Sequence, residues 1–290
     1  MNEINEIKKM VKEKYAIIAE QSTEQNLASC CGATASCCGD DVAGNGTYKI
    51  MSDDYSKLEG YNPDADLGLG CGLPTEFAKI NEGDTVIDLG SGAGNDCFVA
   101  RRFTGEKGKV IGIDFTEQMI TRARLNSEKL GLNNVEFRQG DIDDMPLGDN
   151  IADVVVSNCV LNLVPDKPKV FAEIFRVLKP RGHFSISDIV LEGALPQKWK
   201  EVAELYAGCV SGAIEKKSYL QMIEIAGFKN IIVQKDKTIH IPDEILANYL
   251  SAEEVNAYKT GDTKITSITV YAEKPGLEDK NCCLPGSGCC

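Results

Sequence analysis

The sequence TVIDLGSGAG, residues 85–94, decides the fold. Its first five residues form a short apolar strand pattern, and Gly90, Gly92 and Gly94 follow as a glycine-rich turn. Glycines permit a tight turn and a close approach of the backbone to a ligand. The G-x-G-x-G spacing is one residue shorter than the dinucleotide-binding G-x-G-x-x-G, which must seat a pyrophosphate at a helix N-terminus. The preceding Asp88 disfavours a pyrophosphate and favours a cationic or amine-bearing ligand.

Strand and helix patterns alternate along the chain after this turn. Further strand patterns lie at 109–114, 135–141, 151–163 and 183–190. Helical patterns lie between them at 95–103, 116–132 and 167–182, the last closed by a Pro-Arg-Gly turn. Alternation with short connections predicts an α/β fold, a doubly wound Rossmann-like parallel sheet with helices on both faces.

The segments outside this core differ in composition. We expect residues 1–74 to hold an amphipathic helix at 3–20 and a cysteine-rich loop, and residues 75–190 to form the core. Residues 191–273 predict a mixed, substrate-side domain, with helical patterns at 197–207, 216–226 and 243–258 and a strand near 266–273. Residues 274–290 are polar, and we expect a flexible cysteine-rich tail.

Acidic residues stand at the ends of three successive predicted strands. Asp114 comes 20 residues after Gly94, where an acidic residue takes ribose hydroxyls, and Asp141 is placed to reach an adenine edge. Ligands of such sheets bind at the carboxyl ends of the strands, so S-adenosylmethionine is favoured over a purely structural turn. The candidate cofactor residues are Asp88, Gly90, Ser91, Gly92, Gly94, Asp96, Asp114, Met119, Asp141, Ile142 and Asn158. Together these features resemble class I methyltransferases over about residues 75–190.

Composition excludes several classes of function. The 290 residues carry 44 acidic and 31 basic side chains, a net charge of -13, which argues against a nucleic-acid surface and against anionic membranes. No apolar run approaches a membrane span, and the charged N-terminus does not look like a signal peptide. We therefore expect a cytoplasmic protein with reduced thiols. Only His183 and His240 are available as imidazoles, which argues against Cys2His2 zinc sites.

Cysteine is used in an unusual pattern. Of twelve cysteines, eight form adjacent pairs with CC-x5-CC spacing at both ends of the chain: Cys30-Cys31, Cys37-Cys38, Cys282-Cys283 and Cys289-Cys290. Thiolates prefer soft, thiophilic elements. Three hypotheses remain for these two quartets: capture of a metalloid, binding of zinc or copper(I), or no essential role.

The remaining cysteines stand singly. Cys97 has apolar neighbours and is expected to be a small core residue. Cys71 lies in GLGCGLP, Cys159 follows Asn158 at the end of the fourth predicted strand, and Cys209 lies in AGCVSGA. For any one of these three, a buried structural cysteine is the default expectation. Their number and places make a thiol site the competing hypothesis.

The motifs GLGCGLP, VVVSNCVLNLVPDK and AGCVSGA resemble the three cysteine motifs of the arsenite methyltransferase family, and the resemblance covers about residues 10–235. It implies that Cys71, Cys159 and Cys209 bind trivalent arsenic, supplied as a thiol conjugate. It also implies that a fourth cysteine, Cys30 or else Cys31, forms a transient disulfide with Cys71, which thioredoxin or glutathione then reduces. On this resemblance the catalytic residues are Cys30, Cys71, Cys159 and Cys209.

The chemistry of such a site follows from its residue types. Arsenic held by three thiolates keeps a lone pair that attacks the sulfonium methyl, and no proton leaves arsenic, so no general base is needed. The protein positions the two reactants. Methylation formally oxidises arsenic, and a dithiol such as Cys30/Cys71 can return the electrons. The alternatives are a small-molecule C- or O-methyltransferase with incidental cysteines, and a non-catalytic thiol-rich protein that binds metals or metalloids.

Overall fold

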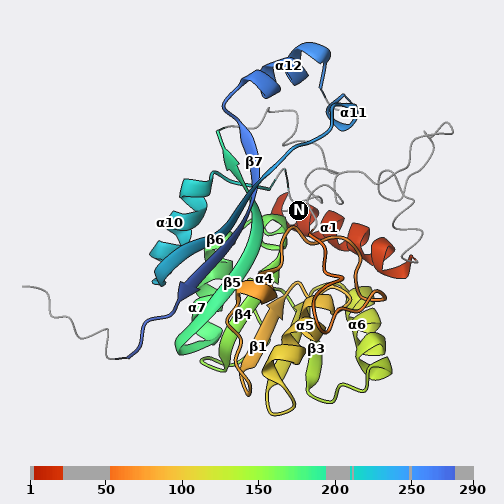
Figure 1. The fold of residues 1–290 in the computed structure, drawn as a ribbon, viewed down its shortest axis with the longest axis vertical. Helices are drawn as coiled ribbons and strands as arrows, with labels where there is room; N and C mark the ends of the chain where they lie inside the picture. The colour runs from red at the N-terminus through yellow and green to blue at the C-terminus, as the bar shows by residue number, and fades with distance from the viewer. Residues whose placement is uncertain (1–2, 22–52, 194–209, 211, 248–249, 278–290) are drawn as a thin grey trace, which may run out of the picture.

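A computed structural model describes residues 3–21, 53–193, 210, 212–247 and 250–277 (Figure 1). One seven-stranded sheet runs through the described part, in the order β3-β2-β1-β4-β5-β7-β6. The strands are β1 (Thr85–Leu89), β2 (Lys109–Asp114), β3 (Val135–Gln139), β4 (Ala152–Asn158), β5 (Leu178–Glu192), β6 (Lys229–Ile239) and β7 (Lys264–Glu273). The chain thus has the class I methyltransferase fold that the sequence predicts.

Helices cover both faces of the sheet. The described helices are α1 (Glu3–Glu20), α4 (Pro74–Phe77), α5 (Asn95–Thr104), α6 (Glu117–Lys129), η1 (Leu161–Leu163), α7 (Lys167–Val177), α10 (Lys216–Ile225), α11 (Asp243–Leu246) and α12 (Ala252–Thr260), of which α11 and α12 project beyond the sheet (Figure 1). Strand alternation sends Val86 into a buried cluster with α5 and α6, and Ile87 into a second cluster with α7 and α10. Both faces of the central strands are therefore buried, as in parallel sheets generally.

The C-terminal strands depart from a wholly parallel sheet. The strands β3, β2, β1, β4 and β5 pair in parallel, whereas β7 pairs antiparallel with both β5 and β6. The strands of segment 191–273 therefore share one sheet with the core. Its role as a substrate-side domain stays a prediction, as do the other domain boundaries.

The structure differs from the prediction in three elements. Strand β6 was not predicted, because charged and polar residues interrupt its apolar ones and all but its last residue are at least partly exposed at the edge of the sheet. The helical pattern at 243–258 divides into α11 and α12, and Ser251 begins α12 with a capping box to Glu254. The Pro-Arg-Gly turn lies within β5, with Arg181 at φ 68°. The predicted helix at 216–226 is confirmed as α10, and the one at 197–207 lies outside the described residues.

Helix α1 confirms the amphipathic helix predicted at 3–20 and packs on α6 near the carboxyl ends of the strands (Figure 1). Ile18 and Ala19 join a small buried cluster with Met119. The guanidinium of Arg122 donates to the carbonyl oxygens of Ala19, at 3.0 Å, and Gln21, at 2.8 Å. The described helices include none that is both long and apolar enough to span a bilayer.

Candidate active site

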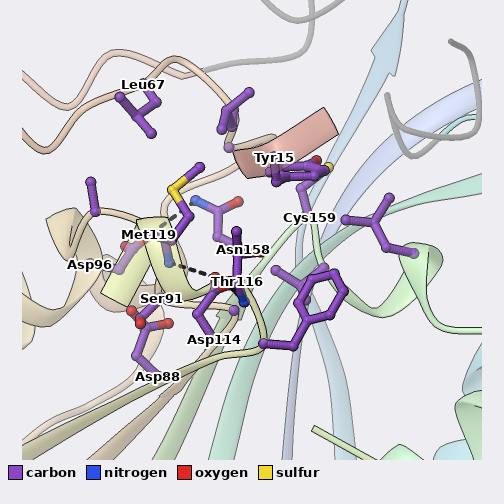
Figure 2. A pocket seen from close by; sticks show the side chains of 18 of the residues that line it. Tyr15, Leu67, Asp88, Ser91, Asp96, Asp114, Thr116, Met119, Asn158 and Cys159 are labelled. Atoms are coloured by element: carbon purple, nitrogen blue, oxygen red, sulfur yellow. Dashed lines mark hydrogen bonds between the residues drawn. The ribbon is translucent and has the colours of Figure 1, made fainter. Parts of the chain in front are cut away.

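The carboxyl ends of the central strands open onto a pocket of about 1070 Å³, its mouth included (Figure 2). All but one of the predicted cofactor residues line it: Asp88, Gly90, Ser91, Gly92, Asp96, Asp114, Met119, Asp141, Ile142 and Asn158. The exception is Gly94, which precedes α5, and a Cβ there would lie 2.8 Å from Phe98 and 2.9 Å from Phe137. Gly94 therefore serves the packing of α5 rather than the pocket wall.

The glycine turn has a backbone that other residues rarely adopt. Gly90, Gly92 and Gly94 have φ values of 68°, 51° and 100°, in the left-handed region that favours glycine. A Cβ on Gly90 would lie 2.4 Å from a methyl group of Val160. The turn thus packs directly against the residue that follows Cys159, which brings the predicted cofactor and thiol segments together.

Asp114 is held in place by two backbone donors. Its Oδ2 accepts the N–H of Gly92 at 3.0 Å, and its Oδ1 accepts the N–H of Thr116 at 2.8 Å. Burial raises the pKa of this carboxyl above its usual range, although both hydrogen bonds favour the charged form. Each oxygen keeps a second acceptor position. This carboxylate at the end of β2 fits a ribose with two adjacent hydroxyls.

Two further carboxyls of the pocket, Asp88 of β1 and Asp96 of α5, lie close together. Burial, and then the neighbouring Asp96 charge, hold the pKa of Asp88 well above its usual range. Burial raises the pKa of Asp96 to about 6. A cation placed beside such carboxyls would favour their ionised forms. The acidic wall therefore fits the ammonium and sulfonium groups of S-adenosylmethionine.

Cys97 confirms its prediction as a buried core residue, with no exposed surface. The structure adds a polar contact, because its thiol donates to Oδ2 of Asp88 at 3.2 Å. Burial and the nearby Asp88 carboxyl raise the pKa of this thiol well above its usual range. Cys97 is therefore a neutral hydrogen-bond donor to the pocket wall.

Tyr55 is a pocket residue that the sequence did not predict. Its side chain is buried, and its hydroxyl donates to Asp96, with the two carboxylate oxygens at 2.8 and 2.9 Å. Burial and the Asp96 charge raise its pKa well above the usual range, so the hydroxyl stays a donor. Tyr55 comes from an irregular segment with no periodic pattern, 41 residues from its partner, so the sequence carried no signal for it.

Lys8 of α1 is a second pocket residue that the sequence did not predict. Its Nζ lies 3.2 Å from Oδ1 of Asp141 and 3.1 Å from Oδ2 of Asp143. Burial lowers the pKa of Lys8, but the hydrogen bonds with the two carboxylates outweigh it and the pKa is raised. Lys8, Val11 and Tyr15 all line the pocket, so α1 forms part of its wall. Asp141, predicted to reach an adenine, thus shares its carboxylate with a lysine.

Two of the predicted thiols are brought together in a buried apolar cluster. Cys71 and Cys159 are 0% and 5% exposed and share this cluster with Val11 and Val210, among others. Cys159 also lines the cofactor pocket and has φ 61°, an uncommon conformation for a side chain other than glycine. Its N–H donates to the carbonyl oxygen of Ser187 at 2.8 Å. Strain of this kind is frequent at functional sites.

The other predicted cysteines, Cys30 and Cys209, lie outside the described residues, as do both quartets. Val210, the neighbour of Cys209, is buried in the cluster that holds Cys71 and Cys159. Within the described ranges, no three His, Cys, Asp or Glu side chains are grouped as a metal site. Neither described histidine lines the pocket.

Comparisons with known proteins find a methyltransferase domain and, among the relatives, several arsenite methyltransferases. A family profile described as a methyltransferase domain matches residues 80–227. An arsenite methyltransferase of Halobacterium salinarum is 37% identical over 284 residues, which are 94% of this chain and 68% of that protein. One of Aquipseudomonas alcaligenes is 36% identical over 72% of this chain and 59% of its own length. A crystal structure of an arsenic(III) S-adenosylmethionine methyltransferase from Chlamydomonas reinhardtii is 34% identical with a TM-score of 0.61, covering 71% of this chain and 68% of that one.

Proposed function

Because the chain belongs to the arsenite methyltransferase family, we propose that it methylates trivalent arsenic held by its own thiolates. The observation that carries the proposal is the position of Cys159. This residue lines the cofactor pocket and belongs to the same buried cluster as Cys71. A thiol-bound arsenic at Cys159 would therefore sit at the wall of the pocket that binds the methyl donor.

S-adenosylmethionine supplies an electrophilic methyl group on a sulfonium when it is bound. Asp114 would hold its ribose hydroxyls, and Asp88 and Asp96 would face its cationic methionine end. Asp141 and Ile142 would lie at the adenine, with Met119 on the wall of the same pocket. The acidic carboxyls and the conformation of the glycine turn support this assignment.

Cys71, Cys159 and Cys209 would hold the arsenic substrate. Trivalent arsenic with three thiolate ligands is pyramidal and keeps a lone pair, so its methylation requires no base. The surrounding cluster excludes water, since Val11, Leu163 and Ile189 are buried around the two described thiols. The protein then needs only to align the arsenic with the methyl group and to exclude water. Such alignment by itself lowers the activation barrier of methyl transfer substantially.

A thiol redox cycle would accompany the transfer. The arsenic gains an As–C bond and is formally oxidised by two electrons. Oxidation of Cys30 and Cys71 to a disulfide returns two electrons to arsenic, and thioredoxin or glutathione then reduces that disulfide. Such a cycle fits a cytoplasmic protein, where these reductants are available.

The test is incubation of the purified protein with arsenite, glutathione, thioredoxin and methyl-labelled S-adenosylmethionine, followed by chromatography of the arsenicals. The wild type should give labelled methylarsenicals, and Cys159→Ser should give none. Cys290→Ser, at saturating arsenite, is the matched control and should retain activity. Normal turnover by Cys159→Ser would place the arsenic site elsewhere. Labelled products from hydroxylated small molecules, without arsenical products, would favour the C- or O-methyltransferase alternative.

A further inference from the structure

Asn158 is bonded to the segment that carries Cys71. Its Oδ1 accepts the N–H of Cys71 at 2.9 Å and the N–H of Gly72 at 3.2 Å, and its Nδ2 donates to the carbonyl oxygen of Gly72 at 2.9 Å. One amide thus satisfies three backbone groups of an irregular segment 86 to 87 residues away. Asn158, predicted only as a cofactor residue, is therefore a structural anchor for Cys71.

The same amide reaches the acidic wall of the cofactor pocket. Nδ2 of Asn158 lies 3.3 Å from Oδ2 of Asp96 and also contacts the Tyr55 hydroxyl. That hydroxyl is 2.8 Å from the same Asp96 oxygen and 3.1 Å from the carbonyl oxygen of Gly72. Asp96 is therefore joined to the backbone beside Cys71 through only two side chains, those of Tyr55 and Asn158.

The segment around Cys71 has little room to move independently of these anchors. A Cβ on Gly70 would lie 2.6 Å from Nδ2 of Asn158, and one on Gly72 would lie 2.5 Å from Oγ of Ser187. The hydroxyl of Ser267 donates to the carbonyl oxygen of Cys71 at 2.5 Å. A change at Asp96 would therefore be transmitted to the backbone of Cys71 rather than absorbed locally.

We infer that Tyr55 and Asn158 are positioning residues that couple the methionine end of the cofactor pocket to the Cys71 thiol, so that binding of cofactor and binding of arsenic favour each other. The inference rests on the proposed arsenic site and adds to it a specific pair of residues through which the two sites communicate.

The sign of the coupling follows from charge. A cation bound beside Asp96 holds this carboxylate in place, and the carboxylate accepts charge-assisted hydrogen bonds from Tyr55 and Asn158. The donors of Tyr55 and Asn158 are then held more firmly, and the Cys71 segment with them. Linkage requires the converse as well, so arsenic bound at Cys71 should tighten cofactor binding by the same factor.

The experiment is calorimetric titration of arsenite with and without saturating S-adenosylhomocysteine, which carries the ammonium group but no transferable methyl. The wild type should bind arsenite about 5-fold or more tightly when S-adenosylhomocysteine is present, the lower end of usual couplings. Tyr55→Phe should reduce that ratio to below about 2-fold, while its affinity for arsenite alone changes less than the ratio does. A purely structural role would weaken arsenite binding equally in both titrations.

Tyr271→Phe is the matched control. Tyr271 is also buried, and its hydroxyl donates to a carboxylate, Glu273, at 2.7 Å, but it lies on β7 away from the pocket. Tyr271→Phe should show the same enhancement of arsenite affinity by S-adenosylhomocysteine as the wild type. Asn158→Ala is the second variant if circular dichroism shows Tyr55→Phe to be unfolded. It should lose the enhancement by S-adenosylhomocysteine and also bind arsenite more weakly on its own, because the N–H groups of Cys71 and Gly72 lose their acceptor.

The outcomes separate this inference from the proposed function. The coupling is overturned if S-adenosylhomocysteine does not change the arsenite affinity of the wild type, or if it enhances that affinity equally in the folded variants. In either case the methyl-transfer proposal stands. Failure of the wild type to bind arsenite at all overturns both.

Discussion

At the scale of single residues, Asp114 offers the most direct test of the cofactor site. Asp114→Ala leaves the N–H groups of Gly92 and Thr116 and the ribose hydroxyls without their acceptor. The expected loss is roughly 1–3 kcal/mol of S-adenosylmethionine binding, about 5- to 150-fold in Kd. Titration calorimetry measures it, with Asp149→Ala, an exposed carboxylate paired with Arg176, as the control. Unchanged affinity in Asp114→Ala would end the ribose assignment.

Asp96 gives a pH dependence. Burial raises its pKa to about 6, from the usual 3.8, so the carboxyl gains a proton as the pH falls through 6. The neutral acid no longer attracts the cationic methionine end, and affinity for S-adenosylmethionine should fall below that pH, by up to about tenfold per unit for one proton. The buried acid stabilises the fold below pH 4 and loses that contribution as the pH rises through 6, so the ligand-free protein should become less stable over that range.

Asp96→Asn separates this carboxyl from its neighbours in the pocket. Its affinity for S-adenosylmethionine should be lower at pH 7.5 and should change less between pH 7.5 and 5 than that of the wild type. Calorimetry at both values is sufficient. A wild-type affinity that stayed constant from pH 7.5 to 5 would show that the charge on Asp96 does not contribute to binding.

Three of the predicted cofactor residues that line the pocket share one property. Asp88, Asp114 and Asn158 follow strand patterns, and parallel strands bring their carboxyl ends to one edge, so sequence order alone places them together. Tyr55 and Lys8 reach the same pocket from a segment without periodicity and from a helix 133 residues away from its partner. Contacts of that kind depend on how irregular segments cross the sheet, which local patterns do not contain.

At the scale of elements, α1 is a wall of the cofactor pocket held by the Lys8 ion pairs. Lys8→Ala should loosen that wall and raise the dissociation rate of S-adenosylmethionine a few-fold, while the association rate changes less. The same rate should rise with ionic strength in the wild type, since the Lys8 side chain is 27% exposed. Stopped-flow displacement measures both.

Lys9→Ala is the control for the helix. Lys9 is 74% exposed and pairs only weakly with Glu13, at 3.8 Å on the same helix. Removing it changes the helix charge by the same amount without touching Asp141 or Asp143. Equal dissociation rates for Lys8→Ala and Lys9→Ala would show that the ion pairs do not retain the ligand.

The strands that were predicted best are those with both faces buried. The strands β1, β2 and β4 are nearly continuous apolar runs, and the pattern identified each of them. Strand β6 lies at an edge of the sheet and carries the charged run 235–237. Charged side chains protect an exposed edge strand from pairing with other chains, but they also obscure the hydrophobic pattern by which a strand is predicted. The break between α11 and α12 depends on a cap at Ser251, a local hydrogen bond inside a helical pattern.

At the scale of the whole molecule, we expect removal of the C-terminal cysteines to leave the described fold intact. Lys274 anchors the end of β7, with its Nζ on the carbonyl oxygens of Phe175, at 2.7 Å, and Leu178, at 2.6 Å. A chain truncated after Pro275 keeps this anchor. If the tail captures arsenite, tethering raises its concentration at the site to millimolar values for a short flexible linker.

Truncation after Pro275 should therefore leave the maximal rate near that of the full chain and raise the apparent Michaelis constant for arsenite. Replacing Cys282, Cys283, Cys289 and Cys290 by serine in the full chain should have the same effect. Initial rates over a range of arsenite concentrations measure it. A lower maximal rate with an unchanged Michaelis constant would instead indicate a redox or structural role for the tail.

The hydrogen bond from Ser267 to the carbonyl oxygen of Cys71 has a consequence for biosynthesis. The two residues are 196 positions apart, and Ser267 lies on β7, which follows β5 and β6 in the chain and inserts between them in the sheet. During translation the segment with Cys71 leaves the ribosome long before its last anchor exists. The surroundings of Cys71 are thus completed only after residue 267 has been made, and a chain terminated before that point lacks this hydrogen bond.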